Sequence, residues 1–135
     1  MLLPFVREMI SGPTPNHHFT ASTEGTGKGL LAAACAFPFL GRELETNAQK
    51  ESDAEWRKAL TSFFQSGGTH YFVDNMSNPA GWDDVPLAVD SGTLAMVWTS
   101  THYRDRILGG NKELNVKIKS IFMSSGNNVE FSLAS

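Results

Sequence analysis

The chain has little of what builds covalent or metal-based frameworks. Cys35 is the one cysteine among its 135 residues, so no disulfide can form within the chain. Its four histidines and this cysteine lack the spacing of zinc ligands, which argues against a zinc cluster. A single thiol suits a reducing compartment, and we therefore expect a cytoplasmic protein.

Long apolar runs are absent as well. No stretch approaches the roughly 18–20 residues that a membrane-spanning helix needs, so no membrane association is expected. The opening residues, Met1 to Arg7, lack the cationic start and apolar stretch of a signal peptide. A length of 135 residues, 41% of them hydrophobic, predicts one globular domain over residues 1–135.

Charge of one sign does not dominate the chain. The net charge of −3 argues against a uniformly basic nucleic-acid-binding protein. The distribution is uneven, because residues 101–120 contain five basic and two acidic side chains while the remainder is acidic. A solvated hairpin with basic side chains explains this asymmetry as well as a binding role does.

Apolar periodicity and helix-breaking residues predict strands that alternate with helices. Expected helices cover residues 2–10, 29–37, 53–65 and 86–99, and expected strands cover 17–22 and 70–73. Ser52 and Glu55 form a capping box at the start of the third helix. A hairpin is expected around Gly109 and Gly110, with arms over 104–108 and 115–119 and the second arm continuing into 120–124. The polar stretch 42–50 is a loop or an edge strand. This alternation is typical of an α/β protein with a largely parallel sheet.

A glycine-rich segment between the first strand and the second helix predicts a phosphate-binding loop. Gly25 and Gly27 allow backbone amides to turn toward phosphate oxygens, and the following helix adds its N-terminal amides and dipole. Lys28 would reach the β- and γ-phosphates. A tight glycine turn capped by a lysine is the structural alternative. The candidate nucleotide-binding residues are Thr23, Glu24, Gly25, Thr26, Gly27, Lys28, Gly29 and Leu30.

The segment departs from the pattern G-x-x-x-x-G-K-[ST] at both ends. Ser22 stands at the first position, and Gly29 stands at the last. Gly29 removes the hydroxyl that normally ligates Mg²⁺. We expect another group or water to fill that place, or the affinity for the metal to be weaker.

Polar residues end two apolar segments. Asp74 follows the strand over 70–73, and an aspartate at the carboxyl edge of a parallel sheet can hold the hydrated Mg²⁺ of a nucleotide. Asn75 stands where a water-activating glutamate would be expected; its amide can orient water but cannot accept a proton. Asn127 follows the second segment, where it could sense the γ-phosphate. Ordinary turn chemistry explains Asn127 equally well.

Together these motifs resemble the AAA+ P-loop ATPases, and more closely the helicase-like ATPase modules of phage and plasmid primase-helicase replication proteins. The likeness covers about residues 2–132. It is carried by Thr23–Leu31, by Glu55-Trp56-Arg57-Lys58, by Phe72-Val73-Asp74-Asn75, by Asp105–Gly109 and by Ser125-Gly126-Asn127-Asn128.

The resemblance implies a three-layer P-loop sandwich with a hairpin before the sensor strand, ATP and Mg²⁺ as cofactors, homo-oligomeric rings and motion on DNA. Lys28 would be the Walker A lysine, Asp74 the Walker B metal-binding acid and Asn127 the sensor. Lys112 at the hairpin tip would contact DNA. Arg104 and Arg106 could act at a neighbouring subunit's γ-phosphate, but a salt bridge within the subunit explains them equally well.

Such modules continue beyond the sensor strand into a helical lid, whereas this sequence ends at Ser135, so a truncated AAA+-like core without its lid is expected. Two functions follow. The chain binds ATP and hydrolyses it as part of the DNA helicase-type motor of a phage or mobile-element replication protein. Alternatively, it is a catalytically weak or inactive remnant that binds a nucleotide or a partner. No guanine-reading Asn-Lys-x-Asp segment appears, which disfavours a GTPase.

Overall fold

The computed structural model describes residues 2–21, 27–76, 87–89, 91–106, 109, 112–127 and 129–131. Helices and strands alternate along this part of the chain. Its elements are α1 (Leu3–Val6), the 3₁₀ helix η1 (Arg7–Met9), β1 (His17–Ala21), α2 (Lys28–Leu40), β2 (Thr46–Asn47), α3 (Asp53–Gln65), β3 (His70–Met76), β4 (Leu87–Val89), α4 (Gly92–Thr99), β5 (His102–Arg106), β6 (Glu113–Lys117), β7 (Ile121–Asn127) and β8 (Val129–Phe131).

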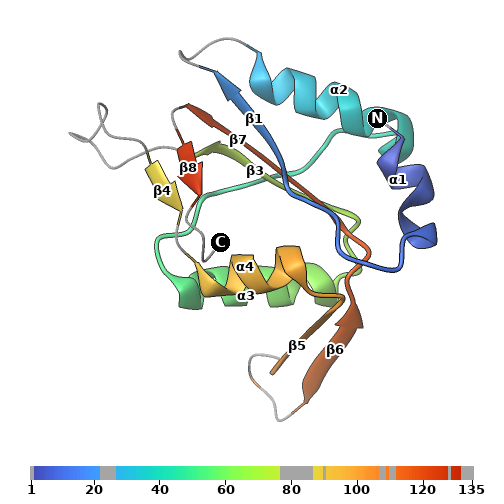
Figure 1. Ribbon diagram of the computed structural model, residues 1–135, viewed down its shortest axis with the longest axis vertical. Helices are drawn as coiled ribbons and strands as arrows, with labels where there is room; N and C mark the ends of the chain where they lie inside the picture. The colour runs from blue at the N-terminus through green and yellow to red at the C-terminus, as the bar shows by residue number, and fades with distance from the viewer. Residues whose placement is uncertain are drawn as a thin grey trace.

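Four parallel strands form the central sheet, in the order β1-β7-β3-β2 (Figure 1). β7 lies between β1 and β3 and pairs in parallel with both. The α/β architecture with a largely parallel sheet is therefore confirmed. β4 and β8 form a separate parallel pair, and β5 and β6 form an antiparallel hairpin.

Helices cover the two faces of the sheet, α2 on one and α3 with α4 on the other (Figure 1). Alternating side chains of β3 supply both cores, because successive residues of a strand point to opposite faces. Tyr71 and Val73 pack with α3 and α4, whereas Phe72 packs with Ala32 of α2. The chain leaves β1 through α2 on one face of the sheet, and it leaves β3 toward α4 on the other face (Figure 1).

The start of α3 is the most accurate of the helix predictions. The helix covers Asp53–Gln65, and the Ser52 hydroxyl accepts a hydrogen bond from the Glu55 amide at 3.3 Å. Glu55 reaches back to the amide of Glu51, one residue before the cap. α2 is longer than expected, since it passes Pro38 and ends where Gly41 adopts a φ of +64°. Pro38 lies in the last turn, where its missing amide leaves the Ala34 carbonyl without its helical partner.

Three other predictions need correction. The helix expected over 86–99 is wrong in its first half: residues 87–89 form β4, and α4 begins only after its cap, Ser91. The helix expected over 2–10 divides into α1 and η1. The second hairpin arm ends at Lys117, and Ile121 begins a separate strand of the central sheet.

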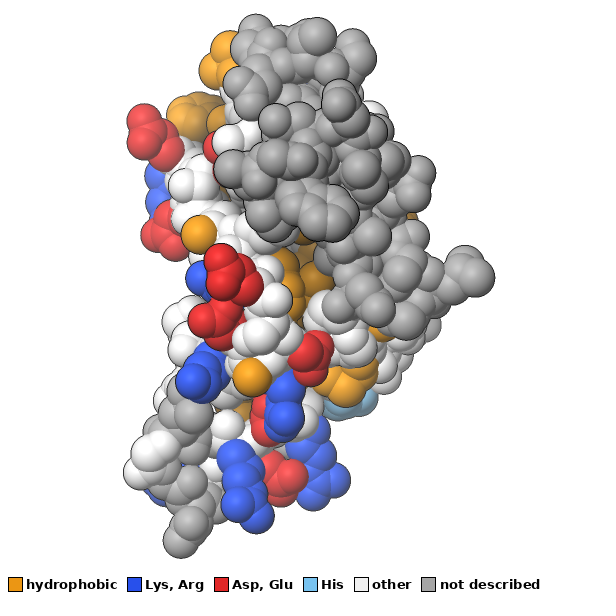
Figure 2. Space-filling view, turned by 90° about the vertical axis from the view of Figure 1, so that its left-hand side faces the viewer, with side chains coloured by type: hydrophobic (Ala, Val, Ile, Leu, Met, Phe, Trp, Pro, Cys, Tyr) orange, Lys and Arg blue, Asp and Glu red, His pale blue; other side chains and the backbone are white. Residues whose placement is uncertain are grey.

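Charged side chains gather around the hairpin end of the molecule, where Figure 2 shows basic and acidic groups interspersed. Arg104 Nε lies 2.7 Å from Glu113 Oε1, across the two arms. Arg57 of α3 binds Asp105 with two hydrogen bonds of 2.9 and 3.1 Å. Each ion pair lowers the pKa of its carboxyl group. Because Arg57, Arg104 and Glu113 are exposed, these pairs fix side-chain positions more than they stabilise the fold.

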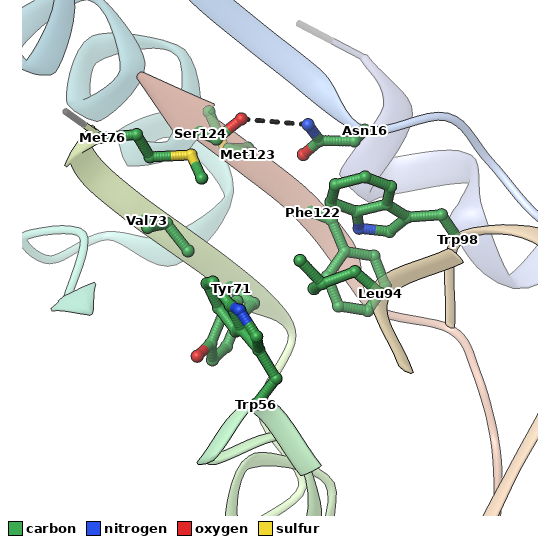
Figure 3. Close-up of a pocket in the computed structure, with 10 residues that line it drawn as sticks. All are labelled: Asn16, Trp56, Tyr71, Val73, Met76, Leu94, Trp98, Phe122, Met123 and Ser124. Carbon is green, nitrogen blue, oxygen red and sulfur yellow. Dashed lines mark hydrogen bonds between the residues drawn. The ribbon is translucent and has the colours of Figure 1, made fainter. Parts of the chain in front are cut away.

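A narrow hollow lies between the sheet and the α3–α4 layer (Figure 3). Its walls are mostly apolar, and the Asn16 amide donates to the Ser124 hydroxyl at 2.9 Å beside it. Tyr71 lines the hollow and is 3% exposed. Within the described part of the chain its hydroxyl has no hydrogen-bond partner. Burial raises the pKa of this phenol to about 12.

Tyr71→Phe is expected to raise the free energy of unfolding by about 1 kcal/mol at pH 8, because it removes an unpaired buried hydroxyl. In the wild type, the phenol ionises near pH 10 when unfolded but only near 12 when folded. This pKa difference leaves the free energy of unfolding of the wild type unchanged well below pH 10. The free energy of unfolding then falls as the pH rises toward 12, by about 2 kcal/mol at pH 11.5. Urea unfolding at pH 8 and 11.5 measures both effects.

Tyr103, the other tyrosine, is the matched control. Its hydroxyl lies 2.8 Å from Thr61 Oγ1 and is buried with it. Tyr103→Phe should therefore lower the free energy of unfolding by about 1 kcal/mol at pH 8. The same sign for both variants would contradict the account of Tyr71.

None of the described helices is long and apolar enough to cross a membrane.

Candidate nucleotide-binding site

The start of α2 presents the features of a phosphate-binding helix. Gly27 adopts the left-handed region with φ +84°, which favours glycine, and the helix begins at Lys28. The Leu31 amide donates to the Gly27 carbonyl at 2.9 Å, which closes the first turn. The cap residue, Gly27, has no side chain that could accept from the first amides. The first amides of a helix have no acceptor within it and carry the positive end of its dipole.

Only the second part of the predicted loop falls in the described chain. Gly27, Lys28, Gly29 and Leu30 are placed, with Lys28 half-buried and Leu30 exposed. Thr23, Glu24, Gly25 and Thr26 lie outside the described residues. The strand before the loop and the helix after it are both present, as the sequence predicted.

Asp74 lies directly beside this helix start. A Cβ atom at Gly29 would stand 3.5 Å from Oδ1 and 3.7 Å from Oδ2 of Asp74. Strand alternation explains the direction of the carboxylate, because Asp74 shares its face of β3 with Phe72, which packs against α2. The two segments that the sequence singled out, 46 positions apart at Lys28 and Asp74, thus meet at one edge of the sheet.

A β-bulge shapes this edge. We expected the strand to end at Asp74, but β3 continues to Met76 with a shift of register between Val73 and Met76. Asn75 adopts φ +53° there, a conformation that asparagine tolerates better than most residues. The extra residue turns Met76 into the core on the α3–α4 side and leaves the Asn75 side chain exposed.

Ser125 of β7 holds the two polar residues of β3 together. Its hydroxyl donates to Asp74 Oδ1 at 2.7 Å and accepts from the backbone amide of Asn75 at 3.0 Å. Ser125 is 1% exposed. This serine belongs to the stretch Ser125-Gly126-Asn127-Asn128 that carried the resemblance, but no role was predicted for it. Its position two residues after the buried Met123 was the available signal, since both face α2.

Asn127 lies at the same edge in the backbone register. It pairs with Ala21, the last described residue before the predicted loop. The carboxyl ends of β1, β7 and β3 therefore meet around the start of α2, which is where open α/β sheets bind their ligands.

The predicted hairpin residues do not join this cluster. Arg104 and Arg106 are in β5, and Lys112, which is exposed, immediately precedes β6. Figure 1 shows the hairpin at the end of the molecule away from the start of α2. Arg104 makes the salt bridge with Glu113 within the chain, one of the two explanations that the sequence left open.

The polar groups at the carboxyl edge of the sheet fit a metal ion that binds together with a phosphate ligand. No group of three or more His, Cys, Asp or Glu side chains that could hold an ion occurs among the described residues. Asp74 contributes one carboxylate beside helix amides. Mg²⁺ keeps several waters and commonly binds through one or two carboxylates together with substrate phosphates, so this donor set fits a nucleotide-bound Mg²⁺.

No protein-family model, curated protein or solved structure matches this chain.

Proposed function

We propose that the edge formed by the start of α2, Asp74 and Ser125 binds a nucleoside triphosphate, ATP, together with Mg²⁺. The observation that carries the proposal is the distance of 3.5 Å between the Gly29 Cβ position and Asp74 Oδ1. It brings an anion-attracting helix N-terminus and a lone carboxylate to the same place. An anion alone would be repelled by Asp74, whereas a phosphate–magnesium complex satisfies both groups.

Each residue then has a distinct task. The amides that follow Gly27 bind phosphate oxygens, and Lys28 neutralises the β- and γ-phosphates. Asp74 accepts hydrogen bonds from water around the cation. Asn75 and Asn127 supply amide groups that could orient an attacking water or sense the γ-phosphate.

The finer assignment rests on the resemblance to AAA+ helicase-like ATPases. We propose a P-loop sandwich of that type, working in a homo-oligomeric ring as part of a DNA helicase motor. The parallel sheet with helices on both faces and the hairpin directly before β7 support this arrangement. Lys112 would contact DNA, and Arg106, if it acts on a nucleotide, would do so in a neighbouring subunit.

Binding without efficient turnover is the second candidate, and two residues favour it. Gly29 offers no hydroxyl to the metal, and Asn75 cannot accept a proton from water. Under this alternative the chain holds ATP and Mg²⁺ but hydrolyses the nucleotide slowly. A multiple-turnover phosphate-release assay separates this alternative from the ATPase proposal. Sustained phosphate release by the purified chain excludes the alternative.

Lys28→Ala is expected to weaken ATP binding at least tenfold, because one charge-assisted contact with phosphate is worth about 1.5–3 kcal/mol. Isothermal titration calorimetry with a non-hydrolysable ATP analogue and Mg²⁺ measures the change. Lys58→Ala, on the exposed face of α3, is the matched control and should bind as the wild type does. Unchanged affinity in Lys28→Ala would refute the proposed site.

A further inference from the structure

Gly29 lacks the hydroxyl that the usual P-loop pattern places beside Asp74. A side chain there would start 3.5 Å from one oxygen of Asp74 and 3.7 Å from the other. A serine or threonine in the usual P-loop pattern would thus carry its hydroxyl against this carboxylate as well as toward the metal. Gly29 can do neither, so the orientation of Asp74 must come from another group.

Ser125 is in position to orient the Asp74 carboxylate. It approaches Asp74 from β7, and its hydroxyl proton is committed to Asp74 Oδ1 at 2.7 Å. A lone pair of the same oxygen accepts from the backbone amide of Asn75 at 3.0 Å, which fixes the rotation of the hydroxyl. At 1% exposure, water cannot readily compete for either bond. Hydrogen bonds to an ionised acceptor are about twice as strong as neutral ones.

The neighbouring serine shows that this arrangement is not general along the strand. Ser124 is also buried, at 3% exposure, but it faces the other side of the sheet. Its hydroxyl accepts from Asn16 Nδ2 at 2.9 Å and lies 2.8 Å from His18 Nδ1. The two adjacent serines are similarly buried but face opposite sides of the sheet, and of the two only Ser125 contacts Asp74.

We propose that Ser125 is a positioning residue that replaces the hydroxyl absent from position 29: it holds Asp74 Oδ1 so that the carboxylate keeps its remaining lone pairs for the water shell of Mg²⁺. This inference rests on the proposed nucleotide site. It makes a different prediction, because it concerns the dependence of binding on the metal and not binding of the phosphates as such.

The test measures binding of a fluorescent, non-hydrolysable ATP analogue at increasing Mg²⁺ concentrations. In Ser125→Ala the Mg²⁺ concentration that gives half-maximal binding should rise about tenfold, the typical effect of losing an outer-shell partner of a metal ligand. Affinity without Mg²⁺ should stay within about twofold of the wild type. Ser124→Ala is the matched control and should leave the Mg²⁺ dependence unchanged.

Rescue distinguishes positioning from a merely structural role. Adding Gly29→Ser to Ser125→Ala should bring the half-maximal Mg²⁺ concentration back to within about threefold of the wild type, since the new hydroxyl reaches the same carboxylate. Gly29→Ser alone should lower that concentration, and it leaves the buried serine intact should Ser125→Ala prove unstable. Binding of Mn²⁺ to the nucleotide complex, followed by electron paramagnetic resonance, gives an independent readout of the metal.

The outcomes separate the two proposals. Normal ATP binding with an unchanged Mg²⁺ dependence in Ser125→Ala overturns the role of Ser125 and leaves the nucleotide site standing. A lack of any effect of Gly29→Ser, alone and in the double variant, overturns it as well. A wild-type chain that binds no nucleotide overturns the site and the positioning role together.

Discussion

Asp74→Asn is expected to weaken ATP binding about 100-fold in the presence of Mg²⁺ and not to weaken it in the absence of Mg²⁺, where the carboxylate only repels the phosphates. The carboxylate lies beside the start of α2, where its negative charge would attract the cation. Asparagine has nearly the same shape, and its side-chain oxygen can still accept the hydrogen bond from Ser125. The substitution thus removes charge while it preserves packing.

Calorimetric titrations of the ATP analogue with Mg²⁺ and with a chelator give both affinities. Glu43→Gln removes the same charge from an exposed position in the loop after α2 and should leave both unchanged. Equal losses with and without Mg²⁺ would mean that Asp74 supports the fold of the loop and not the cation.

The largest expected effect on stability is that of Phe72→Ala, which should lower the free energy of unfolding by about 3–5 kcal/mol. Phe72 is 1% exposed and lies in the apolar cluster that joins the sheet to α2, together with Ala32, Ile121 and Met123. Its removal leaves a cavity in the centre of this cluster. Because a domain of this size is stable by about 5–15 kcal/mol, the loss takes a large share of the total.

Urea unfolding followed by tryptophan fluorescence measures this change. Phe37→Ala is the matched control, since Phe37 lies on α2 but is 56% exposed. It should change the free energy of unfolding by about 0.5 kcal/mol or less. Comparable losses in the two variants would contradict the placement of the core between α2 and the sheet.

Much of the architecture could be predicted because it is encoded locally. α3 is the clearest case: Ser52 and Glu55 lie within the first turn, and their preference for a helix start needs no distant partner. The segment over 86–99 failed for the opposite reason. β4 exists through its pairing with β8, more than forty residues later, and no local pattern in the sequence announces that pairing.

The candidate site could likewise be predicted from the sequence only in part. The sequence predicted that Lys28 and Asp74 would lie at the same edge, because strand ends of a parallel sheet converge there. It could not predict the contact of Ser125 with Asp74, since that depends on the register of β7 against β3 and on the bulge at Asn75. A displacement of β7 by one residue would turn the serine to the other face, and a displacement of β3 would turn Asp74 away from it.

The order of the strands also has a consequence for how the chain is made. β1 precedes the other strands of the central sheet in the sequence, yet the strand beside it in the sheet is β7, the last of them in chain order. The contact of His18 with Ser124 spans 106 positions, and that of Arg7 with the Ile118 carbonyl spans 111. During translation, β2, α3 and β3 can associate as soon as they are made, while β1 must wait for β7, which follows it by more than 100 positions. Completion of the sheet, and with it the assembly of the edge that carries Asp74, is therefore a late event in folding.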